Sequence, residues 1–365
     1  MGGYSIIEPN NIGFVTSIDK RVYAEATALP FPHIELKNNQ LDIDCKGVYK
    51  NNKIVLKDET EQKKATFIRD AVQFALNYLE QRGVKLHGVS VKTKSDAAFS
   101  IDAAKSGLGS SAAVTVATVG AVLSLHGIDL INKKEIEALH KIAQYSHCTS
   151  QGKAGSGFDV ASSTYGSIRY SRYSPELIKM SLSQAIGSKW DYSITPINLP
   201  SFFYAVVANI PNNSTSTTQM IAKVKEFKEK NKAEYTKMIS ELNEYNQKAI
   251  KCLEILQAQR SEEKLAEFEK WFDSARGILK TLGEKSGIEI ESNEMTQLIE
   301  ESKKHGAFTA SLPGAGGGDS IAGLCLSQTD AFKLKSFWSK SGLELLDISI
   351  DNTGFKVETS VLKRP

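Results

Sequence analysis

Three glycine-rich segments carry the residues of this sequence that are best suited to chemistry. The first reads Lys105-Ser-Gly-Leu-Gly-Ser-Ser-Ala112 and leads directly into Ala113–Leu125, an apolar run of helical length. Glycines let a ligand approach the backbone closely, and the first N–H groups of a helix have no intrahelical partner. The segment therefore predicts an anion site that holds a nucleotide phosphate, with Lys105, Ser110 and Ser111 beside it.

Two other interpretations of the first segment stay open at this point. Gly107, Gly109 and Ala112 fit the G-x-G-x-x-G/A pattern of dinucleotide-binding folds, and Asp129 lies near the position of a ribose-binding acid. Against a nicotinamide-dependent oxidoreductase, residues 98–105 are short and half polar instead of forming a long apolar first strand. The segment also lacks the Gly-Lys-Ser/Thr of a Walker A sequence. The blandest interpretation is a plain turn between a strand and a helix.

Two further segments strengthen the phosphate interpretation. Gln151–Asp159 places Lys153 and Asp159 around three glycines, although Asp159 alone would equally suit a helix cap. Pro313-Gly-Ala-Gly-Gly-Gly-Asp319 predicts a nest of backbone amides for an anion. Three such segments, with cations at two of them, predict a set of phosphorylated ligands.

The histidines and cysteines predict little chemistry. The six histidines form no cluster with metal-ligand spacing, and we expect His147 and Cys148 to be packing residues rather than a nucleophile pair. The four cysteines lie far apart without a CxxC spacing, which indicates reduced thiols and a cytoplasmic protein.

Composition limits the class of protein. A length of 365 residues favours two domains, and 41% hydrophobic and 24% charged residues are typical of a globular protein. A net charge of +3 is too small to indicate a nucleic-acid partner. The apolar run at residues 112–125 is too short to span a bilayer, so we expect no membrane partner.

The three segments need strands and helices to position them. In the first part of the chain, residue patterns predict strands at residues 12–28, 34–36, 41–43, 53–56, 88–94, 98–101 and 167–173, and helices at 66–81, 113–125, 133–146 and 160–165. The rest predicts strands at 202–210, 308–311 and 321–326 around a charged helical region at 219–305, whose Lys/Glu runs we interpret as solvated faces. This mixture favours an α+β fold. A polar stretch at 181–200 suggests domains at residues 1–198 and 199–365.

The motifs resemble those of a known kinase superfamily. Gly107-Leu-Gly-Ser-Ser-Ala-Ala113 is similar to the central phosphate loop of the GHMP kinases. Within that superfamily, the pattern most resembles the phosphomevalonate kinases of eukaryotic type. Four stretches carry this likeness: Gly2–Glu8, Gln151–Val160, Tyr165–Glu176 and Gly314–Asp319. Mevalonate kinases, the alternative, typically carry Pro-Ser-Gly-Ile-Asp at the second segment and no Asp at the third.

The resemblance implies a fold and a reaction. The fold has two domains, the first like domain 2 of ribosomal protein S5 and the second an α/β sandwich, with the active site in the cleft between them. The reaction is transfer of the ATP γ-phosphoryl group to (R)-5-phosphomevalonate, with Mg²⁺, by a monomer or homodimer. Family members also carry a strand with Pro-Gly-Lys ahead of the Gly-Gly-Tyr motif, and we expect the basic contact of that strand to be missing from this sequence.

The resemblance also implies roles for particular residues. Lys105 and Asp159 take the catalytic positions, and Ser111 is expected to bind Mg²⁺. The nucleotide would be bound by Ser106, Gly107, Leu108, Gly109, Ser110, Ser111 and Ala112. The second substrate would be bound by Lys153, Gly155, Ser156, Ser216, Gly314, Ala315, Gly316, Gly317 and Asp319.

Overall fold

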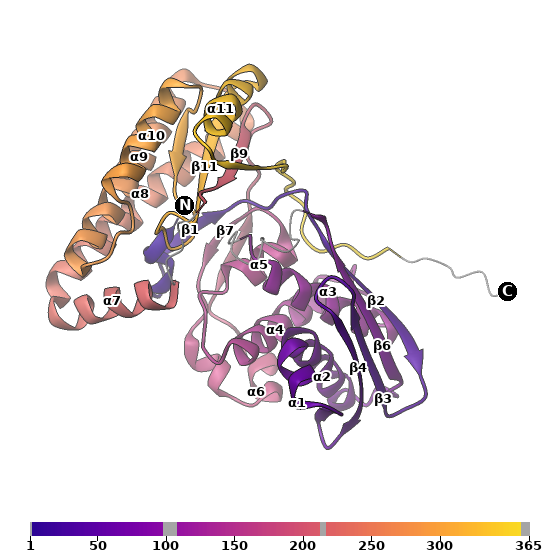
Figure 1. The fold of residues 1–365 in the computed structure, drawn as a ribbon. Helices are drawn as coiled ribbons and strands as arrows, with labels where there is room; N and C mark the ends of the chain where they lie inside the picture. The colour runs from indigo at the N-terminus through magenta and orange to yellow at the C-terminus, as the bar shows by residue number, and fades with distance from the viewer. Residues whose placement is uncertain (1, 98–107, 212–216, 359–365) are drawn as a thin grey trace.

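The computed structural model describes residues 2–97, 108–211 and 217–358, and shows two halves that meet in the middle of the molecule (Figure 1). Each half has its own sheet and helices, and a third, small sheet lies where the halves meet. The predicted α+β class with two domains is confirmed. The boundary at residue 198 stays a prediction. No helix in the described ranges is long and apolar enough to cross a membrane.

A five-stranded sheet organises the N-terminal half, in the order β2-β6-β3-β4-β5. Its strands are β2 (Val22–Leu29), β3 (His33–Asn38), β4 (Ile43–Lys50), β5 (Lys53–Leu56) and β6 (Gly88–Ser95). Among these described strands, β3 and β6 run parallel and the other neighbouring pairs are antiparallel. The dinucleotide-binding alternative requires a mostly parallel sheet, so it does not fit this fold.

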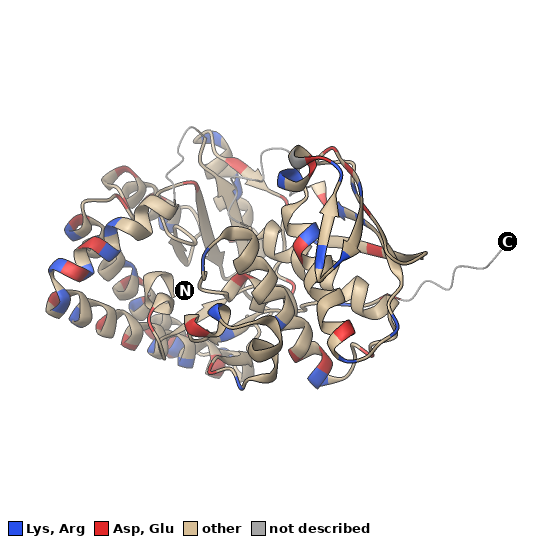
Figure 2. Cartoon of the chain, turned by 90° about the horizontal axis from the view of Figure 1, so that it is seen from below, with Lys and Arg blue, Asp and Glu red and all other residues tan. Residues whose placement is uncertain are grey.

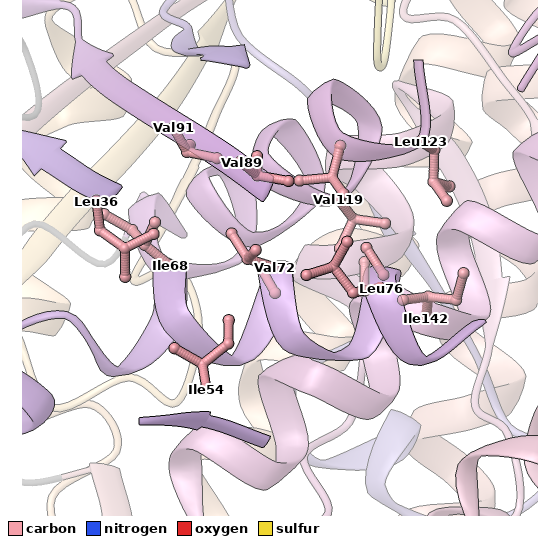
Figure 3. Packing of buried hydrophobic residues seen from close by; sticks show 14 of the residues in the cluster. Leu36, Ile54, Ile68, Val72, Leu76, Val89, Val91, Val119, Leu123 and Ile142 are labelled. Atoms are coloured by element: carbon pink, nitrogen blue, oxygen red, sulfur yellow. The ribbon is translucent and has the colours of Figure 1, made fainter. Parts of the chain in front are cut away.

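Two helices cover one face of this sheet, α2 (Thr66–Gln81) and α3 (Ser110–Leu125), and α4 (Lys133–Gln151) packs against both of them. Figure 3 shows apolar side chains of the strands facing those of the helices, among them Leu36, Val89, Val91, Ile68, Val72, Leu76, Val119 and Leu123. Each such side chain contributes about 1.5–3 kcal/mol when fully buried. Because α3 is apolar on nearly all sides, it packs against strands on one side and α2, α4 and α5 on the other, while Gly109, Ser110 and Ser111 at its N-terminus stay half-buried.

Shorter elements complete the N-terminal half. They are α1 (Glu59–Lys64), α5 (Phe158–Tyr165), α6 (Leu182–Gly187) and the 3-10 helix Pro175–Lys179. The Asn132 side chain caps α4, because it accepts a hydrogen bond from the Lys134 N–H at 2.9 Å.

The small sheet at the junction has the order β1-β7-β8, with β1 (Ile12–Val15), β7 (Ile168–Ser171) and β8 (Ser193–Pro196). Its first strand follows a 3-10 helix, η1 (Gly3–Ile7), and packs on helix α8 of the other half. The Asn243 side chain in α8 accepts a hydrogen bond from the Ile12 N–H at 2.9 Å. Residues 2–15 therefore lie between the two halves.

The C-terminal half has a four-stranded sheet in the order β10-β11-β9-β12. Its strands are β9 (Tyr204–Asn209), β10 (Thr309–Ser311), β11 (Ser320–Cys325) and β12 (Glu344–Leu346). Its helices are α7 (Thr217–Lys230), α8 (Lys232–Ala258), α9 (Glu262–Ser286), α10 (Asn293–Lys304) and α11 (Gln328–Lys340). The third glycine-rich segment is the turn between β10 and β11.

Charged residues of both signs alternate along the long helices of the C-terminal half (Figure 2). Many lysines there pair with an acidic residue one turn away, as Lys230 does with Glu226 at 2.7 Å and Lys248 with Glu244 at 2.6 Å. Exposed pairs of this kind contribute little to stability. The interpretation of these runs as solvated faces is confirmed.

The end of the chain crosses back to the N-terminal half. Residues 350–355 run beside the start of β2, and the Arg21 guanidinium pairs with Asp351 and donates to the Gly354 carbonyl at 3.1 Å. The ring of Phe355 fills the space that a Cβ at Gly120 of α3 would occupy. Both ends of the described chain thus link the two halves (Figure 1).

Two sequence expectations are corrected by the sheets. Residues 12–28 form two strands instead of one, because β1 pairs with β7 and β2 pairs with β6 in a different sheet. The strand expected at residues 41–43 begins only at Ile43 and continues to Lys50. The strand expected at residues 98–101 lies outside the described residues.

Candidate active site

The N-terminus of α3 provides the first part of the site. Gly109 precedes the helix in the left-handed conformation, with φ of 76°, and no described side chain caps the helix. The first intrahelical bond runs from the Ala113 N–H to the Gly109 carbonyl, so the N–H groups of Ser110, Ser111 and Ala112 have no intrahelical acceptor. This end of the helix fits an anion.

The N-terminus of α5 lies beside it. The Cβ of Asp159, in the first turn of α5, lies 3.7 Å from the position that a Cβ at Gly109 would take. The two glycine-rich segments are therefore neighbours although fifty residues separate them. One Asp159 carboxylate oxygen accepts a hydrogen bond from the Val160 N–H at 2.9 Å.

The second segment has a fixed shape. Gly157 has φ of 81°, and a Cβ there would lie 2.6 Å from the Gln144 side-chain oxygen and 2.8 Å from the Tyr170 hydroxyl. Tyr170 itself donates to the Ser156 carbonyl at 2.7 Å, and Tyr173 donates to the Gly155 carbonyl at 3.2 Å. Tight packing therefore holds this segment in place.

The third segment turns through four glycines with positive φ, Gly314, Gly316, Gly317 and Gly318. A Cβ at Gly316 would lie 2.5 Å from the Ile290 carbonyl oxygen, and the Gly317 N–H donates to that oxygen at 2.9 Å. The Asp319 carbonyl accepts a hydrogen bond from the Ile210 N–H at 3.1 Å, which ties the segment to the end of β9.

The N-terminal helix η1 connects the second and third segments. The Tyr4 hydroxyl donates to the Ala315 carbonyl at 3.2 Å. On the other side, Arg172 donates to the Ile7 carbonyl at 2.8 Å and to the Ala154 carbonyl at 3.2 Å. The Gly-Gly-Tyr motif at residues 2–4 therefore lies between the two segments that are predicted to bind substrate.

A lysine of the second segment also reaches the C-terminal half. The Lys153 ammonium group donates to the Thr218 hydroxyl, in the first turn of α7, at 3.3 Å. Lys105, Ser106, Gly107 and Ser216, which the sequence analysis assigns to the site, lie outside the described residues.

Comparisons with known proteins now decide the family. The family described as "GHMP kinases N terminal domain" matches residues 67–167, and the family described as "GHMP kinases C terminal" matches residues 256–343. The chain belongs to the GHMP kinases. The two matches cover the first two glycine-rich segments and much of the C-terminal half, the third segment included.

Two curated relatives and one solved structure resemble this GHMP kinase over nearly its whole length. The peroxisomal phosphomevalonate kinase of Arabidopsis thaliana is 26% identical, covering 98% of this chain and 94% of the relative. The phosphomevalonate kinase of Saccharolobus solfataricus is 29% identical, covering 99% of this chain and 96% of the relative. The structure of Streptococcus pneumoniae phosphomevalonate kinase with phosphomevalonate and AMPPNP has a TM-score of 0.74 at 20% identity, covering 96% of each chain.

One buried histidine of this GHMP kinase contacts the predicted nucleotide site. His147 in α4 lies 3.0 Å, through Nε2, from the Ser111 hydroxyl, and its ring packs on Phe67. Burial lowers the pKa of His147, and the negative charge of Asp159 offsets this only in part. The sequence analysis assigned His147 to packing alone, so it missed this polar contact.

Oxygen donors are available for a magnesium ion. The described residues contain no cluster of three or more His, Cys, Asp or Glu side chains that would bind a metal alone. The Ser111 hydroxyl lies at the α3 N-terminus, where nucleotide phosphates would supply further oxygens. A set of hydroxyl, phosphate and water oxygens fits Mg²⁺, which usually keeps several waters and few protein ligands.

A separate groove of about 540 Å³ lies between β5, α2 and the end of α4. Its lining is polar and includes Arg69, Asp70 and Ser150, whose hydroxyl donates to the Asp70 carboxylate at 2.9 Å. None of the predicted site residues lines it, so we base the site on the three segments instead.

Proposed function

We propose that this GHMP kinase transfers the γ-phosphoryl group of ATP to (R)-5-phosphomevalonate, giving (R)-5-diphosphomevalonate and ADP. The observation that carries the proposal is that the N-termini of α3 and α5 lie side by side, with Asp159 in the first turn of α5 next to Gly109. The full-length likeness to phosphomevalonate kinases supports the choice of acceptor.

The α3 N-terminus would hold the phosphates of ATP. The N–H groups of Ser110, Ser111 and Ala112, which have no acceptor within the helix, would supply the donors, and Leu108 and Gly109 would shape the approach. We propose Lys105 as the cation that bridges donor and acceptor phosphates, with Ser106 and Gly107 completing the loop. Mg²⁺, bound through the Ser111 hydroxyl, would neutralise charge on the phosphates.

Asp159 would orient the reacting groups. The acceptor is a phosphate with a second pKa near 6, so it is largely dianionic at neutral pH and needs little deprotonation. The main barrier is to bring two polyanions together, which makes positioning and charge neutralisation the chief contributions. We assign Asp159 to holding Lys105 or the acceptor in line.

The second and third segments would bind the acceptor. Lys153, Gly155 and Ser156 flank or follow Ala154, whose carbonyl accepts from Arg172, and Arg172 also donates to η1. Through Tyr4, η1 in turn contacts the third segment. The glycines of the third segment, which have positive φ, let its backbone approach a ligand closely, while the N–H groups of Gly316 and Gly317 donate to the Pro313 and Ile290 carbonyls. The remaining proposed contacts are Ser216, Gly314, Ala315, Gly316, Gly317 and Asp319.

Further parts of the proposal concern the whole protein. We propose domains at residues 1–198 and 199–365, and a monomer or homodimer. A cytoplasmic location suits the four cysteines, which are buried free thiols, because reducing compartments keep thiols unpaired.

The test is coupled ADP release with five acceptors: mevalonate, phosphomevalonate, diphosphomevalonate, homoserine and galactose. We expect kcat/KM for phosphomevalonate to exceed every other value by at least about 100-fold, since a bound phosphate dianion forms charge-assisted bonds that mevalonate lacks. A higher kcat/KM for mevalonate would replace this proposal with the mevalonate kinase alternative.

A further inference from the structure

His147 and Ser111 form a hydrogen-bonded pair at the N-terminus of α3. The Nε2 atom of His147 lies 3.0 Å from the Ser111 hydroxyl and 3.2 Å from the side-chain amide nitrogen of Gln151. An amide nitrogen only donates, so with the Gln151 amide oriented as it is in this structure, Nε2 is the accepting nitrogen of the His147 ring. With Nε2 as acceptor, the Ser111 hydroxyl is the donor of the other contact, so Ser111 and Gln151 share the single Nε2 lone pair.

This direction decides what the Ser111 oxygen can do at the α3 N-terminus. Once its proton points at His147, the hydroxyl has only lone pairs left to offer. A hydroxyl in this state suits a cation and is poorly suited to donate to a phosphate oxygen. A partner that orients a metal-binding side chain in this way often changes metal affinity by 10–100-fold when it is removed.

We propose that His147 is a positioning residue that accepts a hydrogen bond from the Ser111 hydroxyl and thereby turns the lone pairs of the Ser111 oxygen toward the cation of the bound nucleotide. The inference rests on the proposed function, because it places a metal–nucleotide complex at the α3 N-terminus. The packing around His147 holds its imidazole ring in one orientation. His147 is buried, and its imidazole lies 5.5 Å from the Phe67 ring, centroid to centroid.

The same helix provides a matched control. His140 lies two turns earlier in α4 and is also buried, but neither of its ring nitrogens has a hydrogen-bond partner among the described residues. It packs instead against the rings of Tyr165, Trp190 and Tyr192. His140→Phe therefore makes the same change in side chain without removing an acceptor.

The experiment measures Mn²⁺ binding by the electron paramagnetic resonance signal of free Mn²⁺, with the non-hydrolysable imidodiphosphate analogue of ATP and no acceptor. We expect His147→Phe to weaken Mn²⁺ binding about tenfold. Affinity for the metal-free nucleotide should change less than twofold. His147→Gln should recover most of the loss, since its amide oxygen reaches a similar place, and His140→Phe should match the wild type.

A double-mutant cycle shows whether the effect passes through Ser111. Ser111→Ala should weaken Mn²⁺ binding, and adding His147→Phe to it should cause no further loss. Additive losses, or unchanged Mn²⁺ affinity in His147→Phe, overturn the proposal. If His147→Phe does not fold, His147→Met takes its place in the cycle, because methionine adapts to irregular space and is a weak acceptor.

Turnover adds a second readout. In His147→Phe, the Mg²⁺ concentration for half-maximal rate should rise about tenfold while KM for phosphomevalonate stays within twofold of the wild type. The Mn²⁺ measurement needs no acceptor, so a wild-type enzyme that fails to phosphorylate phosphomevalonate refutes the proposed function and leaves the binding result standing.

Discussion

At the scale of single residues, Asp159 carries a sharp prediction. It lies at the start of α5 beside Gly109, where the transferred group would pass. Asp159→Asn keeps the shape and the hydrogen bond from the Val160 N–H but removes the charge. We expect kcat to fall at least about 100-fold with little change in the KM for ATP, measured by steady-state ADP release.

Asp129→Asn is the matched control for this charge removal. Asp129 also accepts one backbone hydrogen bond, from the Ile131 N–H at 3.0 Å, but it follows the far end of α3. Its variant should retain wild-type kcat and KM. Equal losses in both variants, or full activity in Asp159→Asn, would remove Asp159 from the catalytic site.

The second residue prediction concerns His140 and pH. Burial lowers the pKa of His140 to about 3, against about 6.5 in the unfolded chain. Between these two pKa values the unfolded state binds a proton that the folded state does not. His140 therefore leaves the free energy of unfolding unchanged above pH 6.5 and lowers it progressively as the pH falls from 6.5 toward 3. The loss is about 1.4 kcal/mol per pH unit for one such group.

Urea unfolding at a series of pH values measures this effect. His140→Phe removes the imidazole that takes up a proton when the chain unfolds, while keeping a ring among Tyr165, Trp190 and Tyr192. The free energy of unfolding of the variant should fall less steeply than that of the wild type between pH 6.5 and 4. If the free energy of unfolding of the two proteins falls in parallel over this pH range, His140 does not cause the loss of stability in acid.

At the scale of elements, the turn before α5 depends on one glycine. Gly157→Ala places a methyl group 2.6 Å from the Gln144 side-chain oxygen, in a left-handed backbone conformation. Gly83→Ala, at the end of α2, has similar φ but nothing within 4 Å of the new methyl group. We expect Gly83→Ala to cost about 1 kcal/mol of unfolding free energy.

Gly157→Ala should cost more than this, because the clash adds about 1–3 kcal/mol, and it should also lower kcat since Asp159 lies two residues later. Chemical denaturation and ADP release together check both effects. If the two glycine variants lose equal stability and keep equal kcat, the packing around Gly157 does not position α5.

The elements also show what the sequence predicts and why. The apolar stripe of residues 66–81 predicts a helix with the bounds observed for α2, because such a stripe requires only local periodicity. The partition of residues 12–28 between two sheets depends on pairing with β6, about 65 residues away, and with β7, about 155 residues away, and such distant pairing leaves no local signal.

Glycine-rich segments predict candidate site positions since left-handed turns demand glycine. Tyr4, Arg172 and His147 were missed as site residues because their contacts form only after folding.

At the scale of the whole molecule, Tyr4 connects the start of the chain to a segment 311 residues later, through its hydrogen bond to the Ala315 carbonyl. Tyr4→Phe removes that bond alone, which costs about 1 kcal/mol and lets the third segment move relative to η1. We expect the KM for phosphomevalonate to rise about fivefold, with the KM for ATP unchanged, because the third segment belongs to the proposed acceptor site and not to the proposed ATP site. Tyr49→Phe is the matched control, since the buried Tyr49 hydroxyl contacts Asn77 and Glu80 within the N-terminal half. Steady-state kinetics with each substrate varied in turn should show the acceptor effect in Tyr4→Phe alone, and an equal rise in the KM for ATP would show that η1 holds the two halves together without serving the acceptor site.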